Sequence, residues 1–147
     1  LDSNQVRRGW PWLRKTWQED CRLHALPPPQ REWAAACPDA IFKGIRLIAL
    51  TSEAALIDEG QVMAHCIADY FLPHCLGKNA QVYSARDRKT LERLATVALV
   101  VGDDGSWMID DVKARSNREA APIVHAAARA LVATVNVRAA RKQGMKR

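Results

Sequence analysis

The chain has 147 residues, of which 48% are hydrophobic and 26% are charged, and its formal net charge is +6 at pH 7. This length and apolar share predict one domain with its own core, and they exclude a chain too polar to fold. No apolar run approaches the roughly 18 residues that a membrane-spanning helix needs, so we expect no membrane partner.

Four cysteines stand at positions 21, 37, 66 and 75, and no two of them form a C-x-x-C pair. This pattern is typical of reduced thiols rather than of a disulfide framework. We therefore expect a cytoplasmic protein.

Residues 1–29 are predicted to form an N-terminal helical appendage that ends in a proline linker. Trp10 and Trp17 recur at helical spacing, and Pro27–Pro29 cannot continue a helix. The tryptophans Trp10, Trp12 and Trp17 either dock this helix onto the domain or contact a protein partner, and base stacking is a further interpretation.

The main domain is predicted to span residues 30–137. Its first elements are expected to be a short helix over Gln30–Ala36, a strand over Ile45–Leu50 and a helix over Ser52–Glu59. Gly60 is expected to end that helix, because glycine inside a helix costs about 1 kcal/mol relative to alanine.

A central helix is predicted over Glu59–Phe71, closed by Pro73. Its apolar stripe predicts a buried face, and its polar positions four residues apart predict a cluster on the opposite face. The stripe consists of Met63, Cys66, Ile67, Tyr70 and Phe71, and the polar cluster of Gln61, His65 and Asp69.

Three further strands are predicted over Gln81–Arg86, Leu94–Val101 and Ser106–Ala114. The residues Gly102–Gly105 between the last two predict a tight hairpin. We expect an α+β fold in which a three- or four-stranded antiparallel sheet packs against the central helix and a C-terminal helix.

The C-terminal helix is predicted to begin near residues 117–121 and to run to about Val137. Ser116 and Glu119 have the spacing of a capping box, and Pro122 fits only in the first turn. Residues 138–147 are then predicted to be a basic tail that attracts nucleic-acid phosphates, with plain solvation as the alternative. Its charges are Arg138, Arg141, Lys142, Lys146 and Arg147.

Several uncommon residue types fall at fixed spacing in this chain. The pattern E-G-x-x-M-x-H-C-I-x-x-Y covers residues 59–70, and shorter matches include Val82-Tyr83-Ser84-x-Arg86-Asp87, Ala95-Thr96-Val97, Trp107, Ile109 and Asn117. On these residues the run from Ile45 to Asn136 resembles the PcfJ-like family of plasmid and mobile-element proteins. The chain departs from that pattern at Asp111, where we expect glutamine, and at Ala114, where we expect glycine. The resemblance implies a role on conjugative or integrative elements, beside the machinery that processes DNA, and it carries no assigned reaction.

The candidate site is a polar pocket around His65. Asp69, one helical turn away, would orient the imidazole, while Arg86 and Lys113 would bind an anion. In the structural alternative, His65 and Asp69 simply pair on an exposed helix face. The candidate residues are His65, Asp69, Tyr70, Arg86, Thr96, Lys113 and Asn117.

Three places in the sequence carry residue types that suit metal or nucleophile chemistry. The pairs His65-Cys66 and His74-Cys75 suit zinc, and Cys66 is a candidate nucleophile, but neighbouring residues of a helix point about 100° apart. Four acids near one predicted hairpin could hold magnesium, namely Asp103, Asp104, Asp110 and Asp111. Asp103 and Asp104, however, are typical turn residues. We expect no metal and no cofactor.

The function that these patterns favour is that of a nucleic-acid-associated accessory protein of a conjugative plasmid or other mobile element. One alternative is a protein-interaction module that docks onto a DNA-transfer or relaxase complex through the N-terminal tryptophans. Another is a small hydrolase or nuclease that uses the His65 pocket, so the sequence leaves open whether the protein is an enzyme.

Overall fold

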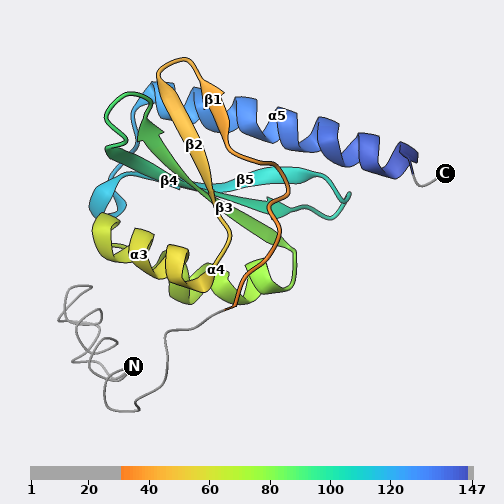
Figure 1. Cartoon of the computed structure of the whole chain (residues 1–147), viewed down its shortest axis with the longest axis horizontal. Helices are drawn as coiled ribbons and strands as arrows, with labels where there is room; N and C mark the ends of the chain where they lie inside the picture. Colours follow the sequence, from red (N-terminus) through yellow and green to blue (C-terminus); the bar gives the residue numbers. More distant parts are fainter. Residues whose placement is uncertain (1–30, 146–147) are drawn as a thin grey trace, which may run out of the picture.

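The computed structural model describes residues 31–145, which build an antiparallel sheet in the order β1-β2-β3-β4-β5 (Figure 1). The strands are β1 (Ala40–Phe42), β2 (Ile45–Leu50), β3 (Ala80–Asp87), β4 (Arg93–Val101) and β5 (Trp107–Lys113). The helices are α3 (Glu53–Met63), α4 (Ile67–Leu76) and α5 (Pro122–Met145), and a short 3₁₀ turn, η1, spans Arg115–Asn117. The predicted α+β class is confirmed, with five strands in place of three or four.

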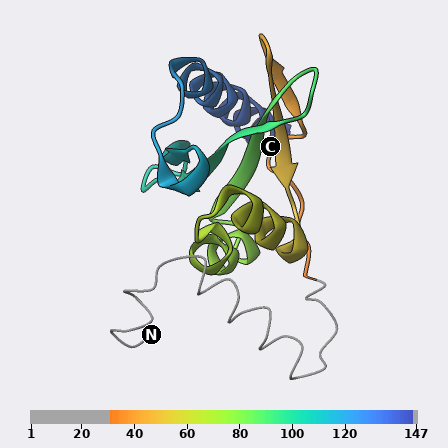
Figure 2. The ribbon, with the colours of Figure 1, turned by 90° about the vertical axis from the view of Figure 1, so that its left-hand side faces the viewer.

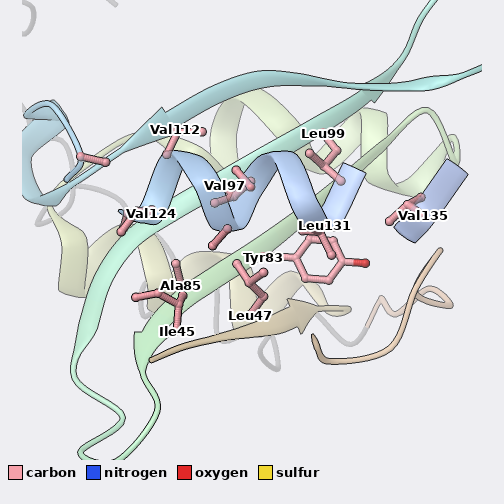
Figure 3. Close-up of a cluster of buried hydrophobic side chains, with 14 of the residues drawn as sticks. Ile45, Leu47, Tyr83, Ala85, Val97, Leu99, Val112, Val124, Leu131 and Val135 are labelled. Atoms are coloured by element: carbon pink, nitrogen blue, oxygen red, sulfur yellow. The ribbon is translucent and has the colours of Figure 1, made fainter. Parts of the chain in front are cut away.

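Two apolar cores lie on opposite faces of this sheet, because successive strand residues point to opposite sides. Val82 belongs to the core under α3 and α4, whereas Tyr83 belongs to the core under α5. Figures 1 and 2 show α5 on one side of the sheet and the α3–α4 pair on the other. Figure 3 shows the α5 core, in which Leu131 and Val135 lie against strand residues such as Leu99.

The segment before the sheet differs from the prediction. The helix expected over Gln30–Ala36 is wrong for residues 31–36, since Trp33 N donates to Thr51 O at 3.0 Å and Glu53 N donates to Arg31 O at 2.9 Å. Pairing with the end of β2 thus replaces helical hydrogen bonds. Strand β1, which the sequence analysis did not predict, is three residues long and reverses into β2 at Lys43 (φ 53°) and Gly44.

The single central helix is also wrong, and so is the break at Gly60. Helix α3 continues through Gly60 to Met63, and the chain turns at Ala64, whose φ and ψ are both 54°. The N–H groups of Ala64 and His65 both donate to Gly60 O. Helix α4 then starts at Ile67 and continues past Pro73 to Leu76.

Helix α5 is longer than predicted. Ser116 has φ 57° inside η1, so it does not cap the helix, and Pro122 is the first helical residue. The helix runs to Met145 instead of ending near Val137, so residues 138–145 are helical rather than a tail. Asn136 fixes α5 to β5, since it accepts from Trp107 N at 2.8 Å and donates to Trp107 O at 3.0 Å.

The predicted N-terminal appendage, including Trp10, Trp12 and Trp17, lies outside the described residues, as do Lys146 and Arg147. Within residues 31–145, no helix combines the length and the apolar character that crossing a bilayer requires.

Candidate functional site: the His65 pocket

The turn between α3 and α4 places His65 against the sheet rather than on an outer helix face. Ala64 takes a left-handed conformation, which costs a non-glycine residue about 1–2 kcal/mol and ends the helix. His65 is therefore buried, only 4% exposed, while Cys66 at the start of α4 is exposed. Such local strain often marks a functional site.

A buried chain of polar contacts connects α3, β4 and this turn. The carboxylate of Glu59, which is fully buried, accepts from Arg93 Nε at 2.9 Å and from Thr96 Oγ1 at 2.6 Å. Thr96 Oγ1 also lies 2.8 Å from His65 Nε2. Arg93 reaches outward to Asp58, and its Nη2 donates to Asp58 Oδ2 at 2.6 Å. We call the Arg93, Glu59, Thr96 and His65 set the buried polar chain.

The buried polar chain fixes the tautomer of His65. Thr96 has one hydroxyl proton and donates it to the Glu59 carboxylate, so His65 must donate Nε2–H to Thr96. In the neutral ring Nδ1 then keeps a lone pair, and within residues 31–145 it has no hydrogen-bond partner. Burial lowers the pKa of His65, against smaller raising effects of Glu59, of its own backbone and of Asp111, so the neutral ring is favoured.

This arrangement predicts a pH-dependent stability. Because the pKa of His65 is lowered in the fold, the unfolded chain binds more protons at this residue once the pH falls below about 6.5. The contribution of His65 to the free energy of unfolding is present above that pH and is lost as the pH falls towards the lowered pKa. The slope is at most about 1.4 kcal/mol per pH unit. Urea unfolding of the intact chain and of His65→Gln between pH 7.5 and 5 measures it. We expect the free-energy difference between the two proteins to shrink on acidification, and a constant or growing difference would contradict the neutral assignment.

A pocket of about 360 Å³ opens between α4, β4 and β5 beside the buried polar chain. It contains five of the seven predicted binding residues, namely His65, Tyr70, Thr96, Lys113 and Asn117. The other lining residues are Cys66, Ile67, Phe71, Ala98, Asp110 and Asp111.

Two of the predicted residues do not line the pocket. Asp69 is exposed on α4, and it does not stack on His65 because α4 begins only at Ile67 and leaves His65 in the preceding turn. Arg86 lies on β3, where its Nε donates to Ser84 Oγ at 3.0 Å. The strand register pairs Thr96 with Ser84 rather than with Arg86, so Arg86 lies further along the sheet.

Glu59 and Arg93 were not predicted as site residues. Glu59 lies three residues after Leu56 and four before Met63, which are both buried, so an acid occupied the apolar stripe of α3. A carboxylate at such a position needs a partner, and this signal could have identified it. Arg93 carried no comparable local signal.

The charges around the pocket do not favour a simple anion site. Two carboxylates, those of Asp110 and Asp111, line it with one ammonium group, and Lys113 Nζ is 4.0 Å from Asp111 Oδ1. The expected anion site, which also needed Arg86, is therefore not assembled here.

Nucleophile and metal chemistry find little support in this geometry. Partial burial of the thiol, and then the charge of Asp69, raise the pKa of Cys66, which opposes thiolate formation. Among the described residues, no group of three or more histidine, cysteine, aspartate or glutamate side chains could hold a metal ion. Cys75 is fully buried beside the exposed His74.

Comparisons with protein-family models, with curated proteins and with solved structures gave no significant match.

Proposed function

We propose that this protein is a nucleic-acid-associated accessory protein that contacts phosphates through the C-terminal turns of α5. The mobile-element setting comes from the sequence resemblance to the PcfJ-like family. The phosphate contact comes from the charges of α5, and this observation carries the proposal.

Helix α5 has no acidic residue between Pro122 and Met145. The exposed cations of its C-terminal turns, Arg138, Arg141 and Lys142, are spaced by three and four residues, which places them on one helical face. Within the described part of the chain, none of the three forms an ion pair with an acid. Unpaired cations on a rigid helix are a suitable surface for phosphate groups.

The helix is anchored just before its three C-terminal cations. Val135 is 1% exposed in the core, and Asn136 bonds to the backbone of Trp107 on β5. The turns beyond these residues extend past the sheet in Figure 1. The cations are thus held in a fixed direction, unlike those of a solvated tail.

Neutralising this face tests the proposal. Labelled single- and double-stranded DNA and RNA are titrated across a salt series with the intact chain and with Arg138→Gln/Arg141→Gln/Lys142→Gln. We expect weaker binding and, for duplex DNA, a salt slope reduced by up to roughly 2.7, about 0.9 for each phosphate contact removed.

A matched control removes three charges elsewhere, through Lys78→Gln/Arg88→Gln/Lys89→Gln, all exposed positions around β3. This control should keep most of the affinity and the salt slope. Equal losses in both triple variants would indicate only a net-charge effect, and absence of binding by the intact chain would overturn the proposal.

A further inference from the structure

The pocket beside His65 combines a buried imidazole with an exposed aromatic ring. His65 is 4% exposed and forms part of the wall, and its Nδ1 has no partner within residues 31–145. Leaving such a buried polar atom unpaired costs about 1–3 kcal/mol, so it needs an explanation. Tyr70, which also lines the pocket, is 64% exposed and packs edge-on against Phe71 at 4.8 Å.

The polar groups of the pocket are mainly acceptors. They include the carboxylates of Asp110 and Asp111, of which Asp111 Oδ1 also accepts from Val112 N at 3.0 Å, while the one ammonium group, on Lys113, lies near Asp111. A ligand that fits should therefore donate N–H groups. The apolar part of the wall, formed by residues such as Ile67 and Ala98, together with the Tyr70 ring, favours a flat ring system.

We propose that this pocket takes an unpaired nucleobase with an exocyclic amino group, whose N–H groups are accepted by the pocket and whose ring stacks on Tyr70. Cytosine, adenine and guanine carry such an amino group, whereas uracil and thymine present a carbonyl oxygen in its place. This inference deepens the nucleic-acid function proposed above. It rests on that function for the claim that the base belongs to a single-stranded nucleic acid.

The residues around the pocket are suited to a nucleic-acid strand that continues beyond the bound base. Asn117 lines the pocket, and the exposed side chains of Arg115 and Arg118 flank it in the chain. Neither arginine forms an ion pair with an acid among the described residues. They are suitable partners for the phosphates next to a bound base, while the carboxylates of Asp110 and Asp111 would disfavour a phosphate inside the pocket.

Free nucleosides test the pocket separately from α5, because they carry no phosphate. The intact chain is titrated with cytidine, adenosine, guanosine and uridine by calorimetry and by NMR shifts of the His65 ring. We expect the three amino-bearing nucleosides to bind roughly fivefold to 150-fold more tightly than uridine, the range expected for one discriminating base contact. Equal affinities, or no shift of His65 with any nucleoside, would overturn the inference.

Two exposed positions allow variants with little effect on folding. Tyr70→Ala should weaken cytidine binding roughly fivefold to 150-fold through lost stacking, while Tyr70→Phe should retain it. Asp111→Asn should reduce the preference for cytidine over uridine, whereas Asp103→Asn, in the exposed β4–β5 turn, should not. Unchanged binding by both Tyr70→Ala and Asp111→Asn would overturn the inference.

The two proposals fail in different ways. The triple α5 variant should lose affinity for oligonucleotides but keep its affinity for cytidine. Oligonucleotide binding that depends on α5 without any nucleoside binding would overturn the pocket inference alone. Cytidine binding without oligonucleotide binding would overturn the nucleic-acid function, and with it the assignment of the base to a strand. Tighter binding of free arginine than of cytidine would also overturn the inference, in favour of a guanidinium site.

Discussion

Replacing Glu59 by alanine is expected to lower the free energy of unfolding by about 3–5 kcal/mol, the cost of breaking a buried ion pair from one side. The substitution leaves Arg93 Nε and the Thr96 hydroxyl without their shared acceptor. It also opens a cavity at a position with no solvent exposure. Urea denaturation monitored by tryptophan fluorescence and by circular dichroism measures the change.

Asp58 offers a matched control on the same helix and with the same partner. Its carboxylate lies 2.6 Å from an Arg93 nitrogen, but its side chain is 60% exposed. Exposed ion pairs contribute about 1 kcal/mol or less, so Asp58→Ala should change little. Similar losses for both variants would mean that burial of Glu59 does not set its contribution. Glu59→Gln nearly keeps the shape of the side chain, so it measures the contribution of the charge to stability separately.

Leu131→Ala is expected to destabilise the protein by about 2–5 kcal/mol, the usual range for truncating a buried leucine. Leu131 is 1% exposed and packs into the core between α5 and the sheet (Figure 3). The lost contacts and the residual cavity both reduce stability, as chemical denaturation would show.

The control for Leu131 is Val137→Ala, further along α5, where the side chain is 51% exposed. It should cost well under 1 kcal/mol, since little apolar surface is lost from the core. The pocket lies on the opposite face of the sheet, so folded Leu131→Ala should still bind cytidine. A large loss from Val137→Ala would indicate that α5 is covered by something beyond the described residues.

The sheet could be predicted because its signals are local. The apolar run that became β4 and the aspartate–glycine turn before β5 depend on neighbouring residues, and both predictions are confirmed. Strand β1 was missed because three residues are too short to show a period. The helix over residues 31–36 was wrong because pairing with the end of β2, a tertiary contact, overrides local propensity.

The site could be predicted only in part. His65, Thr96 and Lys113 lie far apart in the chain, and the structure brings them to one pocket together with Tyr70 and Asn117. Asp69 was misplaced because helical spacing was counted from His65, which lies in the turn before α4 rather than in a helix. The left-handed residue of that turn, Ala64, is not a glycine and gave no local signal. Glu59 was missed because the sequence alone does not pair a buried acid with an arginine 34 residues away.

The most direct measurement is the protonation state of the His65 ring nitrogens in ¹⁵N-labelled protein at pH 7, by long-range ¹H–¹⁵N correlation NMR. The buried polar chain predicts a neutral ring with the proton on Nε2 and a lone pair on Nδ1. Addition of cytidine should shift the resonances of this ring, which forms part of the pocket wall. A proton on Nδ1, or an imidazolium ring at this pH, would contradict the orientation of the chain from Glu59 through Thr96 to His65.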